Sequence, residues 1–268
     1  MDETWVALAR EAGMAAEHLA IGATAFSKAD YARHAYFAQG LFAFSVGIER
    51  SCKLGLAVDH AIDNAGRFPD SRRLRDYGHD LRLLLETLEE IGQRRSVEPP
   101  WNRCPDSDIH RSIISIFTNF ATNVTRYYNL EAVADRTIAV DDPFKAWYEQ
   151  VTKPVIELHM GRATRRRIDR QASEVATALA GNALTRFHGY DGTLITSPFD
   201  LSRLTGETEF ARRWERMYVL QIARFISVLL GHLGGRTEFI PYFNEFYGMF
   251  YNEDDFLRQR KTWSIYGL

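Results

Sequence analysis

Apolar residues recur every three or four positions along most of the chain, and this spacing is the strongest constraint that the sequence places on the fold. It is clearest near the N-terminus, where the apolar positions are Trp5, Leu8, Ala12, Ala15, Ala16 and Leu19. Side chains with this spacing lie on one face of an α-helix, which can then pack against a neighbour. No run of alternating apolar and polar residues predicts a sheet, and no repeat of about 30–45 residues predicts a solenoid. The sequence therefore predicts an all-α protein.

The first half of the chain has the pattern of four consecutive helices. After the N-terminal stripe, apolar periodicity and capping residues predict helices over residues 30–62, 79–92 and 108–130. Glycine and proline residues mark the breaks between them. Helices joined by short connections pack as antiparallel neighbours. We therefore expect residues 1–135 to form an antiparallel four-helix bundle.

Three glycines lie inside the second of these helices, at Gly40, Gly47 and Gly55. A glycine in a helix interior costs about 1 kcal/mol relative to alanine, so their positions need a compensating gain. Absence of a side chain lets the backbone of another helix come close. The three glycines predict a closely packed neighbouring helix.

The second half is also helical but less regular. Helices are expected over residues 143–159, 163–187 and 207–233, with shorter pieces over 241–251, and a turn-rich stretch over 189–198 divides them. The charged stretch 201–216 is expected to face water, and the aromatic C-terminus to form core or an oligomer interface. We predict residues 136–268 to be a helical extension packed on the bundle.

Composition excludes several classes of protein. With 268 residues, a net charge of −2 and 13% aromatic residues, the chain suits neither a disordered protein nor one that binds nucleic acid through overall positive charge. Two cysteines are too few for a disulfide scaffold, which favours a reducing compartment. The N-terminus lacks a signal-peptide pattern, and the most apolar stretch, 218–233, contains Gln, Arg and His. We expect a cytoplasmic protein with no membrane segment, no metal and no cofactor.

The most informative motifs lie between residues 35 and 85. A helix ending with Glu49 and Lys53 is followed, after a loop, by His79, Asp80 and Leu81 at the start of the next helix. This order resembles the HEPN superfamily of helical domains. The later sequence TRYYNLEAV is similar to the Arg–Tyr ending of the fourth helix in some members, and it contains Arg126. The resemblance covers about residues 30–135 and implies a HEPN-like bundle.

The resemblance also implies a function. Catalytic HEPN proteins are metal-independent endoribonucleases of anti-phage defence and toxin systems, with sites that commonly form across a homodimer. Arginine binds phosphate and histidine transfers protons near neutral pH, so Arg126 and His79 are the expected catalytic residues. Glu49 is expected to order the site. An antiparallel bundle would gather Lys53, Asp59, His60, His79, Arg126 and Asn129 at one end, with Lys53 and Asn129 contacting RNA.

Two alternatives remain open. No histidine follows Arg126 within six residues, which favours a non-catalytic HEPN-like module that binds a protein partner or a second copy of the chain. A separate cluster on the predicted helix 163–187 could bind RNA, because Arg162, Arg166 and Arg170 share one helical face. The alternative interpretation of that face, without RNA binding, is a solvated helix surface with salt bridges.

Overall fold

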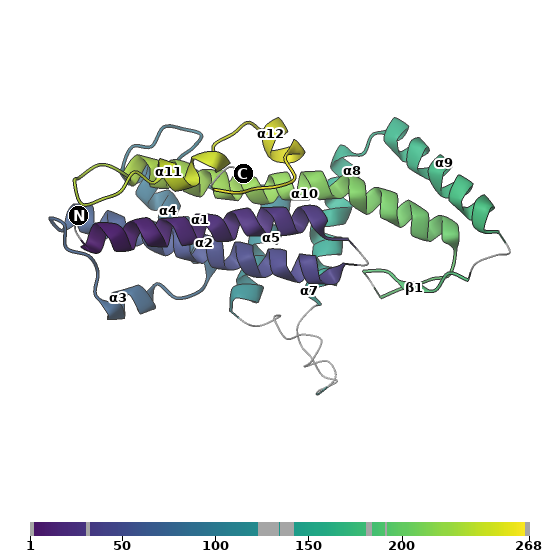
Figure 1. Cartoon of the computed structure of the whole chain (residues 1–268), viewed down its shortest axis with the longest axis horizontal. Helices are drawn as coiled ribbons and strands as arrows, with labels where there is room; N and C mark the ends of the chain where they lie inside the picture. The colour runs from purple at the N-terminus through teal and green to yellow at the C-terminus, as the bar shows by residue number, and fades with distance from the viewer. Residues whose placement is uncertain are drawn as a thin grey trace.

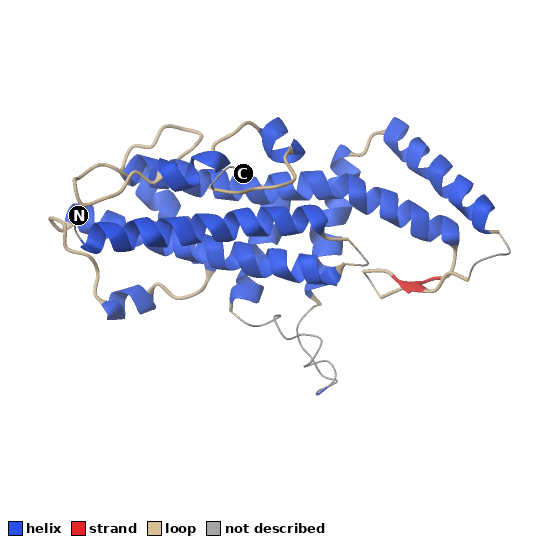
Figure 2. Cartoon of the chain, in the orientation of Figure 1, coloured by secondary structure: helices blue, strands red, loops and turns tan. Residues whose placement is uncertain are grey.

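The computed structural model describes residues 3–30, 33–122, 134, 142–180, 184–190 and 192–265. It confirms the all-α fold, and Figure 2 shows that helices make up nearly all of the regular structure. Two long helices, α1 (Glu3–Lys28) and α2 (His34–Asp63), run antiparallel beside each other (Figure 1). The other elements are α3 (Ser71–Asp76), α4 (Leu81–Arg94), α5 (Asp108–Ala121), α7 (Pro143–Trp147), the π-helix η1 (Tyr148–Thr152), α8 (Lys153–His159), α9 (Arg162–Leu179), α10 (Pro198–Leu233), α11 (Asn244–Tyr247), the 3-10 helix η2 (Gly248–Phe250) and α12 (Asp254–Gln259). Strands β1 (Phe187–His188) and β2 (Leu194–Ile195) form a small antiparallel pair before α10.

The glycines of α2 lie where other helices approach it, as predicted. A Cβ atom at Gly40 would meet the ring of Phe26 at 3.0 Å, and one at Gly47 would meet Leu19 at 2.8 Å. Both contacts join α2 to α1. At Gly55 the nearest side chain is Leu88 of α4, at 3.2 Å. Close helix packing therefore offsets the low helix propensity of these residues.

Helix α4 runs parallel to α2, so the expected antiparallel arrangement is wrong for this pair. His79, just before α4, lies 2.9 Å from Glu49, whereas Arg94 at the end of α4 lies 2.5 Å from Asp59. Both helices thus advance in the same direction. The chain between them is long enough to contain α3 and to return along about 20 Å of α2 before α4 begins. Short connections force antiparallel packing, and this connection is not short.

Helix α10 joins the two predicted halves of the chain. Its C-terminal half is buried and contacts α1, α2, α4 and α5. One continuous core contains Leu19 of α1, Leu88 of α4 and Leu230 of α10. The boundary predicted at residue 135 lies outside the described residues and stays a prediction. The N-terminal half of α10 extends beyond the bundle and pairs with α9 (Figure 1).

The C-terminal aromatic residues pack onto this core. Phe243, Tyr247 and Phe250 are fully buried, and the hydroxyl of Tyr247 lies 2.8 Å from that of Ser51 in α2. Core packing therefore accounts for these three residues. Among the described helices, α10 included, none combines the length and the apolar character needed to cross a bilayer.

The contact at Gly47 generates a stability prediction. A Cβ atom in Gly47→Ala would lie 2.9 Å from the backbone nitrogen of Leu19, so α1 and α2 would have to move apart. We expect a loss of about 1–3 kcal/mol in the free energy of unfolding, measured by urea denaturation. Gly248→Ala is the control, because nothing lies within 4 Å of its Cβ position and its backbone is helical. Equal midpoints for the two variants would contradict this account of the helix contact.

Candidate functional site

Three of the predicted site residues lie together. One oxygen of Glu49, Oε1, is 2.9 Å from Nδ1 of His79 and 2.8 Å from Nζ of Lys53. The His79 side chain is 66% exposed. A carboxylate that accepts a hydrogen bond from Nδ1–H orients an imidazole and leaves Nε2 to exchange a proton with a ligand. Arg126 and Asn129, the other residues expected here, lie outside the described residues.

Asp59 and His60 do not belong to this cluster. Asp59 is ten residues along α2 from Glu49, which corresponds to about 15 Å of helix. Its side chain is nearly buried, and its two carboxylate oxygens bind Arg94 at 2.5 Å and Arg95 at 2.8 Å. These ion pairs join the ends of α2 and α4. Asp59 and His60 therefore do not meet His79 at one end of the bundle as expected, because α2 and α4 are parallel.

The predicted arginine face of α9 is exposed. Arg162, Arg166 and Arg170 all lie on the surface of this helix. None of the three lines the largest cavity beside α9, whereas Arg167 does. The structure thus leaves the predicted face available to solvent and turns a different arginine toward a concave surface.

That concave surface is a cationic cleft between α9, α10 and α12. Its volume is about 690 Å³. We call it the arginine cleft and define it by its cationic lining residues, Arg167, Arg212, Arg213, Arg216, Arg258 and Lys261. Glu209 is the acidic residue that lines it within the described part of the chain. Positive charge therefore dominates the cleft although the chain as a whole is slightly acidic.

Arg216 is the most unusual member of the cleft, because it is only 3% exposed. Its Nη1 donates a hydrogen bond to Ser27 Oγ at 2.8 Å, and its Nη2 donates to the backbone carbonyl of Arg258. Its Nε has no hydrogen-bond partner among the described residues. Burial and the nearby charge of Arg212 lower the pKa of Arg216 to about 10. A buried guanidinium without a carboxylate partner is costly, and an anionic ligand would compensate it.

Neighbouring arginines add positive charge to the cleft, although Asp255 pairs with Arg258 at 2.5 Å. Burial, together with the charges of Arg258 and Arg167, lowers the pKa of Arg213. The Arg213 guanidinium lies 4.6 Å from the ring centre of Phe210, and that of Arg258 lies 4.4 Å from the ring centre of Trp214. Aromatic faces hold these planar groups in place while their N–H donors remain able to bind oxygen. Such an arrangement suits phosphate or sulfate.

The sequence pattern did not predict this cleft. The stretch 201–216 was expected to face water, yet Arg216 is buried, which corrects that expectation. The cleft forms because α9 packs against α10, where a Cβ atom at Gly206 would lie only 2.9 Å from Ile168, and because α12 folds back over α10. Arg212, Arg213 and Arg216 at helical spacing were the available local signal.

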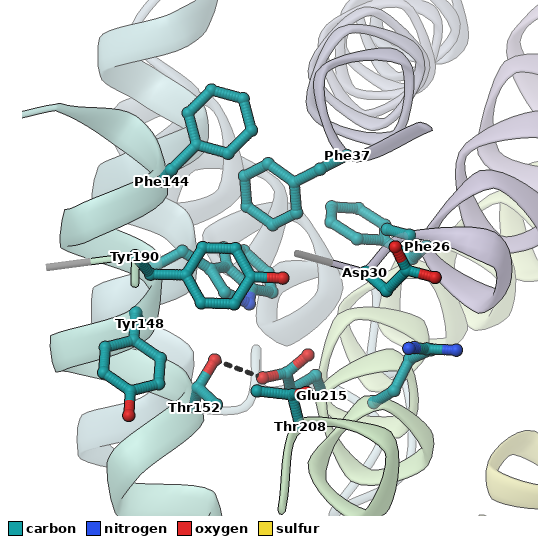
Figure 3. A pocket seen from close by; sticks show the side chains of 12 residues that line it. Phe26, Asp30, Phe37, Phe144, Tyr148, Thr152, Tyr190, Thr208 and Glu215 are labelled. Atoms are coloured by element: carbon teal, nitrogen blue, oxygen red, sulfur yellow. Dashed lines mark hydrogen bonds between the residues drawn. The ribbon is translucent and has the colours of Figure 1, made fainter. Parts of the chain in front are cut away.

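A second cavity lies beside the cleft and is mainly aromatic (Figure 3). Its volume is about 30 Å³, so the side chains leave little free space between them. We call it the aromatic cavity and define it by Phe26, Phe37, Phe144, Trp147, Tyr148 and Tyr190, with Asp30, Thr152, Thr208, Arg212 and Glu215 as its polar lining. Arg212 also lines the arginine cleft, so the two spaces share a wall.

Glu215 supplies the acidic group of α10 in the aromatic cavity. The hydroxyl of Thr152 donates a hydrogen bond to its Oε1 at 2.5 Å (Figure 3). Burial raises the pKa of Glu215, although the hydrogen bond from Thr152 and the charge of Arg212 oppose that shift. Thr152 and Tyr148 belong to η1, and π-helical turns often occur at functional sites.

Comparison with known proteins adds no assignment. No family model, curated protein or solved structure matches the chain. Within the described residues no group of three His, Cys, Asp or Glu side chains is placed to hold a metal ion. The arginine cleft and the Glu49–His79 pair are therefore assessed from their geometry alone.

The raised pKa of Glu215 predicts a pH-dependent stability difference. The folded state retains this proton to a higher pH than the unfolded state does, so the wild type loses stability as the pH rises above about 4.5, the ordinary pKa of glutamate. Glu215→Gln does not titrate. We expect its melting temperature to exceed that of the wild type at neutral pH and the difference to shrink in acid. The exposed Glu157→Gln is the control, and a difference independent of pH would contradict the prediction.

Proposed function

We propose that the protein is an RNA-directed protein that binds the sugar–phosphate backbone in the arginine cleft. The observation that carries this proposal is the buried guanidinium of Arg216, which faces the cleft and has no carboxylate partner among the residues that the structure describes. Guanidinium groups donate to two phosphate oxygens at once and are weakly hydrated, so they suit a partly buried phosphate site. In this proposal the protein acts in the cytoplasm, as a homo-oligomer or with a protein partner.

The number of cationic side chains in the cleft favours an extended polyanion over a single small anion. Six cationic side chains line it, which is more than one phosphate group can contact at once. Several phosphates of one strand would bind several of these side chains. RNA is the polyanion that the HEPN resemblance implies.

Substitutions in the cleft test this proposal. We expect Arg216→Met and Arg213→Ala each to weaken binding of single-stranded RNA by about tenfold, since each removes a charge-assisted phosphate contact. Fluorescence polarisation with labelled RNA measures the affinity over a salt series, and the salt dependence should become shallower in both variants. Thermal melting checks that Arg216→Met folds, which replacement of an unpaired buried charge by an apolar side chain should permit.

Arg166→Ala and Arg170→Ala are the matched controls, because both arginines are exposed on α9 and neither lines the cleft. Both should bind RNA like the wild type. A loss in these variants without a loss in Arg213→Ala would assign RNA to the predicted α9 face instead. Absence of RNA binding by the wild type would favour the partner-binding alternative.

A second candidate activity is metal-independent RNA cleavage, in the anti-phage defence or toxin setting that the resemblance implies. The hydrogen bond between Glu49 and His79 favours it, because a carboxylate-oriented, exposed imidazole is a suitable general base or acid. In this proposal His79 transfers a proton when a ribose 2′-hydroxyl attacks the adjacent phosphate. Arg126 would bind that phosphate, and Lys53 would contact RNA beside it.

Cleavage of labelled RNA in EDTA tests the second candidate. We expect His79→Ala to lower the cleavage rate by about 100-fold or more, and Glu49→Gln by a smaller factor, because the carboxylate only orients the imidazole. Arg126→Ala should also lose activity. His188→Ala, at an exposed histidine of β1, is the control. Equal rates in all variants would remove this assignment, and an inactive wild type that still binds RNA would leave the non-catalytic function.

A further inference from the structure

We infer that the arginine cleft binds the terminal phosphate group of an RNA strand at Arg216, and that the phosphodiester groups next to it contact the exposed cations of the cleft. The inference rests on the proposed function and adds the part of the strand that is recognised. A terminal phosphate has one organic substituent, whereas a phosphodiester inside the strand has two. The depth at which Arg216 lies separates these two ligands.

The cationic residues of the cleft differ in their burial. Arg216 is 3% exposed, and Arg212 and Arg258 are half-buried. The exposed members, which we call the rim, are Arg167, Arg213 and Lys261. Arg216 is therefore the innermost cation, and protein surrounds most of any group that reaches it. A phosphodiester would have to bring a ribose on each side to this depth, whereas a terminal phosphate enters with its free oxygens first.

Arg216 has N–H groups left for such a ligand. A guanidinium carries five N–H donors. One donor of Nη1 binds Ser27 and one of Nη2 binds the carbonyl of Arg258, while Nε has no partner within the described chain. The Ser27 hydroxyl donates its own proton to the carbonyl of Ala23 at 3.0 Å, so Ser27 positions the guanidinium without neutralising it. The remaining donors match the three acceptor oxygens of a terminal phosphate.

Charge favours a terminal phosphate at the inner position as well. The charge of Arg212 lowers the pKa of Arg216, so the two guanidinium groups lie within electrostatic reach of each other. Asp255 offsets the charge of Arg258, but no carboxylate among the described residues pairs with Arg216. A phosphodiester carries one negative charge, whereas a terminal phosphate carries about 1.5–2 near neutral pH. The larger charge gains more from two neighbouring guanidinium groups.

The rim favours a strand over a single phosphate. Arg167 belongs to α9, Arg213 belongs to α10, and Lys261 follows α12, so the rim cations come from three segments of the chain. Exposed arginine and lysine side chains contact phosphodiester groups without regard to base sequence. A strand whose end lies at Arg216 would place its next phosphates among these side chains.

Competition between strands that differ only at their ends tests the inference. The full chain binds an oligouridine of about ten nucleotides with a 5′-phosphate and a 3′ fluorescent label, and fluorescence polarisation follows its displacement. The unlabelled competitors are the same strand with hydroxyl groups at both ends, with a 5′-phosphate or with a 3′-phosphate, and uridine 5′-monophosphate. We expect one phosphorylated strand to compete about tenfold better than the hydroxyl strand, which identifies the end that is bound. Uridine monophosphate should compete less well than that strand.

Variants connect the preference to Arg216. Arg216→Met should remove the advantage of the phosphorylated strand and affect the hydroxyl strand less, so the loss of about tenfold expected for this variant belongs to strands with a terminal phosphate. Arg213→Ala, at the rim, should weaken both strands alike and preserve their ratio. Arg170→Ala is the control, because Arg170 is exposed on α9 and does not line the cleft.

The outcomes separate this inference from the proposed function. Equal competition by the phosphorylated and hydroxyl strands would overturn the terminal-phosphate site and leave RNA binding in the cleft intact. Equal losses for both strands in Arg216→Met would do the same, because Arg216 would then contact an internal phosphodiester. Uridine monophosphate that competes as well as the best strand would make a mononucleotide the ligand and overturn both proposals. No binding of any strand would also overturn both.

Discussion

Burial of the C-terminal half of α10 against four other helices determines where the candidate site lies. The helix has 36 residues and is about 54 Å long, which is more than the bundle can cover. Its buried half, which includes the fully buried Leu220 and Leu230, is held by apolar contacts with α1, α2, α4 and α5. The other half is thereby directed past the bundle, where α9 pairs with it. The arginine cleft and the aromatic cavity both lie along this projecting half.

Buried charge at the cleft carries a cost that packing alone does not explain. Within the described chain, Arg216 is held by a hydroxyl and a backbone carbonyl and by no carboxylate. Sites that retain such unfavourable groups are commonly functional, because the same group becomes favourable when the ligand binds. Asp59 provides the contrast, since two arginines satisfy its nearly buried carboxylate and it closes a structural contact.

The local pattern of the sequence was sufficient to predict the helices and some of the contacts between them. Apolar periodicity predicted the all-α fold, and Gly40, Gly47 and Gly55 marked the close helix approaches correctly. The direction of α4 was not predicted, because it depends on how far the segment between α2 and α4 returns along α2. The cleft was missed because Arg216 meets Ser27 and Arg258, which are distant in sequence. Of the predicted site, the proximity of Glu49, Lys53 and His79 is observed, and their roles remain predictions.

The wall shared through Arg212 has a thermodynamic consequence. If a phosphate draws this guanidinium toward the cleft, the electrostatic field in the aromatic cavity changes at the same moment. The charge of Arg212 lowers the pKa of Glu215, so phosphate binding in the cleft and proton uptake by Glu215 would favour each other by an equal factor, since coupling free energies are reciprocal. One side chain would thus link an anion in the cleft to a proton in the aromatic cavity without any movement of the helices.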